Sequence, residues 1–146
     1  MNAELELKVR DEVEALHVFF TGWIHGELSI DAFEADFVPR FDPEFLLVQP
    51  SGNLVPLDEL LSAARGTHAS NPEFRIAIRN VKVRRAFGNH VLATYEEWQR
   101  NAVAPKPPNN ARMASIIFKQ TDRLEWFHCH ETWLPDAIAS AGPYNF

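Results

Sequence analysis

Glu96 is the first residue of this sequence whose type and surroundings suit a general base. Residues 74–100 alternate apolar and polar side chains, and the alternation places Glu96 on the apolar face of a predicted hairpin, near Ile78 and Trp98. A carboxylate on such a face loses its water, which favours the protonated form and suits proton abstraction. The alternative is that Glu96 bonds to Arg112 across neighbouring strands, or lies in water at the rim.

Arg112 and Glu131 form a second candidate pair, on the last predicted hairpin. If Gln120 pairs with Arg123, the two charged residues stand opposite each other on a face that is otherwise apolar. Removing two charges from water is costly, so the pair is either a structural ion pair or the polar end of a ligand pocket. In the second case Arg112 binds the ligand, and Glu131 is a further candidate for moving a proton.

Four aromatic residues could form the apolar wall of the same pocket. They are Trp23, Phe37, Trp98 and Phe127. Aromatic side chains at helical or strand spacing are core residues by default, and this second interpretation stays open beside the first.

His128 and His130 point to one face of a predicted strand, about 6.5–7 Å apart, and could supply two ligands to a metal. Glu131 points to the opposite face, and the sequence offers no other obvious third ligand. We therefore predict no metal site and place both histidines in a protein interface. Nucleophile-elbow, phosphate-loop and dinucleotide-binding glycine motifs do not occur in the sequence, and we predict no cofactor.

The first half of the chain predicts three helices and a short strand pair, each bounded by turn or cap residues. Each helix has one apolar side, which must cover a sheet or another helix. The helices cover residues 5–25, 29–38 and 57–65, and the strands cover residues 42–48 and 54–55.

The strand predicted at residues 74–87 changes the parity of its apolar residues near Asn80. A one-residue shift of this kind is the pattern of a β-bulge, and bulges bend strands, so we expect strong curvature here. The proline-rich segment 101–110 then connects this hairpin to the last one.

A turn at Gly88-Asn89 determines the register of the first hairpin. It sets Val83 opposite Thr94, which places Glu96 on the apolar face. Glu97 then lies on the outer face, where it can pair with a basic side chain.

The composition predicts one domain, spanning residues 1–146. Lysine and arginine total 14 and aspartate and glutamate 20, and the net charge of −6 argues against nucleic acid or an anionic membrane as a partner. A single cysteine excludes an intramolecular disulfide and a cysteine-rich zinc site. No apolar run approaches the roughly 18 residues of a membrane span, and the N-terminus lacks a signal-peptide pattern, so we expect a cytoplasmic protein.

Helices followed by a meander of four long strands predict an α+β fold, a cone-shaped roll with three helices on the concave face of a curved, mainly antiparallel sheet. This order of elements resembles the nuclear-transport-factor-2-like superfamily, which includes SnoaL-like polyketide cyclases and ketosteroid isomerases. Local stretches are similar to the association domain of calcium/calmodulin-dependent protein kinase type II. They are Phe41-Asp42-Pro43, Gly52-Asn53-Leu54-Val55 and Phe127-His128-Cys129-His130.

The resemblance implies a pocket between the concave sheet face and the helices, and a homodimer that packs through the convex face. It leaves two function classes open. The first is a small-molecule pocket protein like the cofactor-free isomerases and cyclases, with Glu96 or Glu131 moving a proton. The second is a non-catalytic ligand-binding or assembly module. The Tyr–Asp pair of the isomerases and the His–Asp pair of the cyclases cannot be placed on this sequence. The convex face would include Tyr95, Glu97, Trp126, His128 and His130.

Overall fold

A computed structural model describes residues 2–103 and 107–146. Its six strands form one sheet in the order β2-β1-β6-β5-β4-β3. β1 pairs with β6 in parallel and the other neighbouring pairs are antiparallel, so the sheet is mixed. The elements are α1 (Ala3–His25), α2 (Ile30–Ala32), η1 (Phe33–Phe37), η2 (Val38–Arg40), β1 (Phe41–Val48), β2 (Leu54–Pro56), α3 (Leu57–Arg65), β3 (Arg75–Phe87), β4 (His90–Arg100), β5 (Asn110–Gln120), β6 (Leu124–Trp133) and α4 (Asp136–Ala141).

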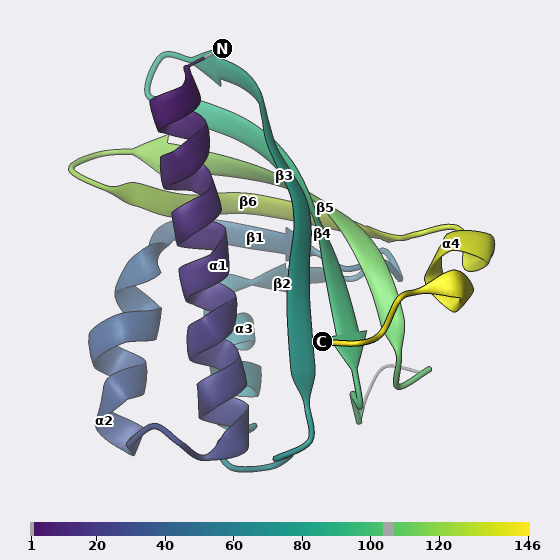
Figure 1. The fold of residues 1–146 in the computed structure, drawn as a ribbon. Coiled ribbons are helices and arrows are strands. Elements are labelled where there is room, and N and C mark those ends of the chain that lie inside the picture. Colours follow the sequence, from purple (N-terminus) through teal and green to yellow (C-terminus); the bar gives the residue numbers. More distant parts are fainter. Residues whose placement is uncertain (1, 104–106) are drawn as a thin grey trace.

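The sheet is curved, and α1 runs along its concave side together with the other helices of the N-terminal half (Figure 1). The short helix α4 lies on the other side of the sheet. This arrangement confirms the predicted α+β cone. The second predicted helix is divided into α2, the π-helical η1 and the 3₁₀-helical η2, which ends next to Pro39.

The first helix, α1, has the caps and the apolar stripe that its sequence predicts. The Asn2 side chain accepts hydrogen bonds from the first turn, and Gly26 ends the helix with a φ of 84°, in the left-handed region that favours glycine. Val9, Val13 and Trp23 on the stripe are completely buried. No helix in the described ranges is long and apolar enough to span a membrane.

The β-bulge predicted near Asn80 is confirmed, and a second one was missed. The register of β3 against β4 shifts between Arg79 and Lys82, and Asn80 has a φ of 57°. It shifts again between Val83 and Arg85, so Val83 pairs with Ala93 and not with Thr94. Because one residue of register reverses the faces of a strand, β4 is turned over relative to the prediction.

The register predicted for the last hairpin is also wrong, although most of its faces are correct. Gln120 pairs with Leu124, and an irregularity leaves Phe127 unpaired between Trp126 and His128. After Phe127 the turn and the irregularity together displace the pairing by two residues from the prediction. A displacement of two residues leaves each side chain on its predicted face. Upstream of Phe127 the faces are exchanged: Trp126 is buried in the core, and its predicted place on the convex face is wrong.

Deleting Asn80 is expected to unfold the protein or leave it barely stable. Without the bulge residue, Val81 and Val83 exchange faces with the rest of β3 and lose their burial. Burying two such side chains contributes about 3–6 kcal/mol, a large part of a typical domain's roughly 5–15 kcal/mol. Urea unfolding followed by circular dichroism measures the loss.

Asn80→Gly is the matched control, because glycine adopts the positive φ of this position without strain. It is expected to change the free energy of unfolding by no more than about 1 kcal/mol. A deletion variant that melts within a few degrees of the parent would contradict the assignment of faces on β3.

Candidate functional site

A cavity of about 650 Å³ lies between the concave side of the sheet and the helices. Its volume is within the range of about 300–1,000 Å³ that small-molecule sites have. One part of its wall is apolar and mainly aromatic, with Phe20, Phe37, Phe41, Phe45 and Leu60. The other part is polar and ionisable, with His17, Tyr95, Glu97, Gln99, Arg112, Cys129 and Glu131.

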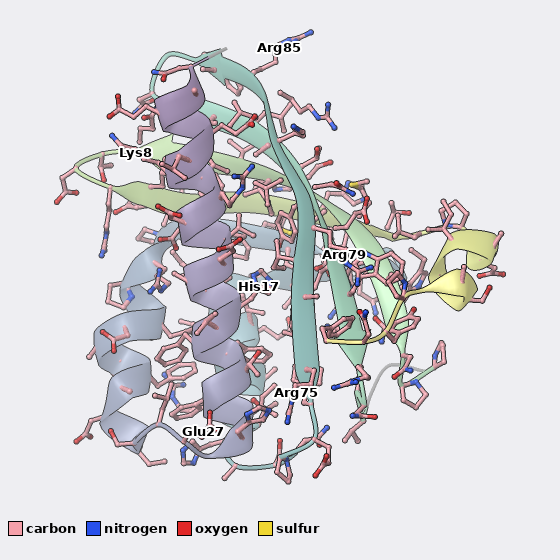
Figure 2. The ribbon with its side chains drawn as sticks, viewed as in Figure 1. Lys8, His17, Glu27, Arg75, Arg79 and Arg85 are labelled. Carbon is pink, nitrogen blue, oxygen red and sulfur yellow. The ribbon has the colours of Figure 1, made fainter. Side chains whose placement is uncertain are left out.

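Five polar side chains form a continuous hydrogen-bonded chain at this polar end. His17 Nε2 lies 3.0 Å from Glu97 Oε1, and Gln99 Nε2 donates to Glu97 Oε2 at 2.5 Å. Asn110 Nδ2 donates to Gln99 Oε1 at 3.4 Å, and Arg112 Nη2 donates to Asn110 Oδ1 at 2.8 Å. The chain therefore runs from α1 across β4 to β5. Figure 2 shows His17 on α1, on the side of the helix that faces the sheet.

The charged groups on either side of the two amides, Arg112 and Glu97, determine the orientation of the amides between them. Arg112 can only donate hydrogen bonds, and an ionised Glu97 can only accept them. Asn110 must therefore present its oxygen to Arg112 and its nitrogen to Gln99, which in turn directs its nitrogen to Glu97. Each amide has one orientation in which all its bonds are satisfied.

His17 and Glu97 form a buried ion pair. Nδ1–H of His17 donates to the carbonyl of Val13 at 2.7 Å, so Nε2 must also carry a proton to donate to Glu97. Burial lowers the pKa of His17, but the Glu97 carboxylate outweighs this effect and the net shift is upward. Burial raises the pKa of Glu97, yet the charge and hydrogen bond of His17, with help from Arg112, bring it to about 2.

Arg112 lies at the other end of the chain, is 8% exposed and lines the cavity. Its Nη1 is 3.5 Å from Glu131 Oε1, at the outer limit of a hydrogen bond, and its guanidinium lies over the Trp133 ring. Its buried Nε–H has no partner among the described residues. A buried donor without a partner costs about 1–3 kcal/mol, so the described residues do not fill every hydrogen-bonding position of this guanidinium.

Glu131 is in a different charge state from Glu97. Burial raises the pKa of Glu131, the negative charge of Glu97 raises it further, and Arg112 offsets only part of this, which leaves a pKa of about 7. A carboxyl group with this pKa can take up or release a proton near neutral pH, as a general acid–base must.

Three of the predicted site residues line the cavity: Phe37, Arg112 and Glu131. Arg112 and Glu131 are in contact as predicted, but diagonally, because Glu131 pairs with Ala114 in the sheet. Trp23 is fully buried in the core behind the cavity wall, where its Nε1–H donates to the carbonyl of Ala64 at 2.9 Å. Trp23 therefore does not line this cavity, contrary to the prediction.

The predicted placement of Glu96, Trp98 and Phe127 in the pocket is also wrong, because all three lie on the outer face of the sheet. Glu96 accepts hydrogen bonds there from Asn80 Nδ2 at 2.8 Å and Trp98 Nε1 at 2.9 Å. The Phe127 ring packs against His90. The unpredicted bulges of β3 and β6 are the physical reason, since a bulge changes the parity between the residues before it and those after it.

His17 and Glu97 are site residues that sequence reasoning missed. His17 follows Val13 by one helical turn, so the spacing of the buried stripe of α1 includes it, and an ionisable residue on such a stripe was the available signal. Glu97 was expected on the outer face, and the second bulge of β3 turns it into the cavity. No residue type in β3 marks that bulge.

In the part of the chain that the structure describes, no three His, Cys, Asp or Glu side chains gather as a metal-binding group. His128 is half-buried and His130 is exposed, and both lie on the outer face of β6 as predicted. Their role in an interface stays a prediction.

Glu131→Gln is expected to change how the free energy of unfolding depends on pH. The pKa of Glu131 rises from its ordinary 4.5 to about 7 on folding, so the stability that it contributes is complete below pH 4.5. This stability is lost as the pH rises from 4.5 to 7, and the loss is about 3 kcal/mol. Urea unfolding of both proteins at pH 5, 6, 7 and 8 isolates the difference, which should favour the variant increasingly as the pH rises.

Glu125→Gln, at the start of β6, controls for the removal of one negative charge from the sheet. An equal pH slope in the wild type and in Glu131→Gln would show that Glu131 titrates as an ordinary solvated carboxylate.

No family model matches the chain. Among curated proteins, sucrose-phosphatase 1 of Nicotiana tabacum is similar, with 26% identity over 133 residues. The match covers 88% of this chain and 31% of that protein, so the chain spans about a third of the length of this relative.

Solved structures match this chain over nearly their whole length. An NTF2-like protein of unknown function from Pseudomonas aeruginosa has a TM-score of 0.77 and 26% identity, covering 86% of this chain and 98% of that chain. The CamKII hub homology domain from Chlamydomonas reinhardtii has a TM-score of 0.62 and 15% identity, covering 92% and 100%. The chain thus has the nuclear-transport-factor-2-like fold, and its structural neighbours are NTF2-like proteins that include a homologue of the kinase association domain.

Proposed function

We propose that this protein binds a small molecule that has an apolar body and an oxygen-bearing end. One observation carries the proposal: Arg112 and Glu131 form the polar end of a cavity whose remaining wall is mostly apolar. The guanidinium of Arg112 lines the cavity and offers N–H donors to the oxygen of the ligand. The aromatic side chains of η1 and β1 supply the surface for its apolar body.

The chemistry that these groups support is a proton transfer within the bound molecule, as in cofactor-free isomerases and cyclases. The ionised Glu131 takes a proton from the carbon that lies between a carbonyl group and a C=C bond of the ligand. The electron pair of that C–H bond forms a new C=C bond to the carbonyl carbon, and the π pair of the carbonyl group moves onto its oxygen. Arg112 stabilises the negative charge of the resulting dienolate. Glu131 then returns the proton to the far carbon of the original C=C bond, the carbonyl group re-forms, and the C=C bond is now conjugated with it, which completes an isomerisation.

The His17–Glu97 ion pair supports this role without touching the ligand's reacting atoms. The negative charge of Glu97 helps to raise the pKa of Glu131 to about 7. The amides of Gln99 and Asn110 hold Arg112 in place through its Nη2. The pair and the amides are therefore positioning groups.

Hydrogen exchange in D2O tests the proposed proton transfer, with 2-tetralone as the probe ketone and NMR as the readout. The wild type is expected to accelerate exchange at the carbon next to the carbonyl group. Glu131→Gln is expected to lower the rate by about 10²–10⁴-fold, the usual contribution of a general base. Equal rates in the two proteins would contradict the role of Glu131.

Glu96→Gln decides between the two carboxylates that the sequence suggests. Because Glu96 lies on the outer face of the sheet, its replacement is expected to leave the exchange rate unchanged. Loss of exchange in this variant alone would return the role of general base to Glu96.

A second candidate is a non-catalytic binding or assembly module, and the outer face of the sheet favours it. Leu92, Met113 and Ile117 are half-buried there, next to His128 and the exposed His130. A face that mixes apolar and polar groups in this way suits a homodimer interface. The fold that the chain has in common with a CamKII hub homology domain is compatible with such an assembly.

Light scattering at micromolar concentration tests the homodimer. The wild type is expected to have about twice the monomer mass of 16.7 kDa. Ile117→Glu, which places a charge in the centre of the outer face, is expected to give a monomer. Leu54→Glu is the matched control, because Leu54 is 63% exposed on the edge strand β2. A monomeric wild type would contradict the interface.

A further inference from the structure

We propose that the cavity binds a carboxylate on an apolar body, and that this anion binds together with one proton, the anion on Arg112 and the proton on Glu131. The inference rests on the proposed small-molecule pocket and names a second ligand class for it, an anion that occupies the pocket without reacting, because a protonated Glu131 is not a base. Its geometric basis is a guanidinium that lines the cavity beside a carboxyl group, with a contact between them of only 3.5 Å.

The elements packed around Glu131 differ in the ionisable side chains that they bring to the cavity. The described parts of β1, η1 and α3 contribute only uncharged side chains to the wall. The ionisable neighbours are His17 of α1, Tyr95 and Glu97 of β4, Arg112 of β5 and Cys129 of β6.

These charges cancel except for that of Arg112. His17 and Glu97 neutralise each other as an ion pair. Burial raises the pKa of the Tyr95 hydroxyl and of the Cys129 thiol well above their ordinary values, so both stay uncharged. With Glu131 protonated, the cavity holds one uncompensated positive charge. With Glu131 ionised, it holds none.

A carboxylate that enters the cavity competes with Glu131 for the same guanidinium. Glu131 contacts only Nη1, at 3.5 Å, so this N–H of a guanidinium that lines the cavity is weakly held and open to a ligand carboxylate. Two carboxylates at one guanidinium repel each other, so binding of the ligand favours protonation of Glu131. The protonated Glu131 can then donate its O–H to the ligand. A dianion would bring one charge more than Arg112 can balance.

This competition gives binding a definite dependence on pH. The pKa of Glu131 is about 7 in the free protein, so below pH 7 the proton is already present and the affinity is constant. Above pH 7 each bound anion takes up about one proton, and the affinity falls about tenfold for each pH unit. An uncharged ligand of the same shape does not have this dependence, because it does not compete as an anion.

Isothermal titration calorimetry with 2-naphthylacetate and its uncharged analogue 2-naphthylacetamide tests the proposal. Measurements at pH 6, 7, 8 and 9 in two buffers of different ionisation enthalpy count the protons taken up. The carboxylate is expected to bind with a constant affinity up to pH 7 and about tenfold more weakly per unit above it. Proton uptake should rise toward one over the same range.

Glu131→Gln separates the proton linkage from the binding of the anion. It is expected to bind the carboxylate at each pH with the affinity that the wild type has at pH 6, and without proton uptake. Glu125→Gln, outside the cavity, should keep the wild-type profile. Arg112→Gln should weaken the carboxylate at least tenfold more than the amide, and Glu131→Gln remains decisive if this variant fails to fold.

Each negative result of these titrations contradicts a different part of the proposal. Equal pH profiles in the wild type and in Glu131→Gln would overturn the coupled binding of a proton. Binding of the amide without binding of the carboxylate would overturn the anion class and leave the proposed pocket intact. If neither probe binds, the proposed small-molecule pocket itself is overturned.

Discussion

The ion pair between His17 and Glu97 is the interaction on which the interior of this protein depends. It joins the central helix α1 to the middle of the curved sheet, and both groups are almost completely removed from water. Taking two charges out of water costs several kcal/mol per ion, and the cost is recovered only when their remaining hydrogen-bonding positions are filled. The Val13 carbonyl and the Gln99 amide fill them, and the polar residues along β4 and β5 follow from this requirement.

Two carboxylates in one small volume reach opposite charge states because their partners differ. Glu97 accepts close hydrogen bonds from the cationic His17 and from Gln99, and it remains ionised. Glu131 has a long contact to Arg112 and the negative charge of Glu97 nearby, and binds its proton near neutral pH. The surroundings of the two carboxyl groups alone make their pKa values differ, which is a usual way to obtain an acid and a base from the same residue type. The cavity wall therefore has one fixed negative charge and one adjustable one.

The fold was predictable from the sequence because its signals lie in apolar residues, whereas the site depended on two bulges that leave no such signal. The parity change at Asn80 is visible because apolar residues stand on both sides of it. The second bulge of β3 falls between Val83 and Arg85, and Arg84 is its extra residue. Arg84 and Arg85 are both charged, so either could face water. The bulge of β6 falls at the adjacent aromatic residues Trp126 and Phe127, and either could face the core. The faces of Glu96 and Glu97 therefore could not be assigned without coordinates. Glu131 lies on the same face as Arg112, as predicted, only because two one-residue shifts of register compensate each other.

The single orientation available to Gln99 and Asn110 also restricts how related sequences can diverge. Replacing one amide with an apolar residue leaves a buried donor or acceptor of the other without a partner, whereas replacing both removes the need on each side. A substitution at only one of the two positions is therefore expected to lower the stability of the fold. Sequences that share this interior should change at positions 99 and 110 together. The same coupling should extend to Glu97 and Arg112, which bond to the two amides. Covariation between these positions of β4 and β5 would then identify proteins that have the same charged interior, even where their surface residues differ.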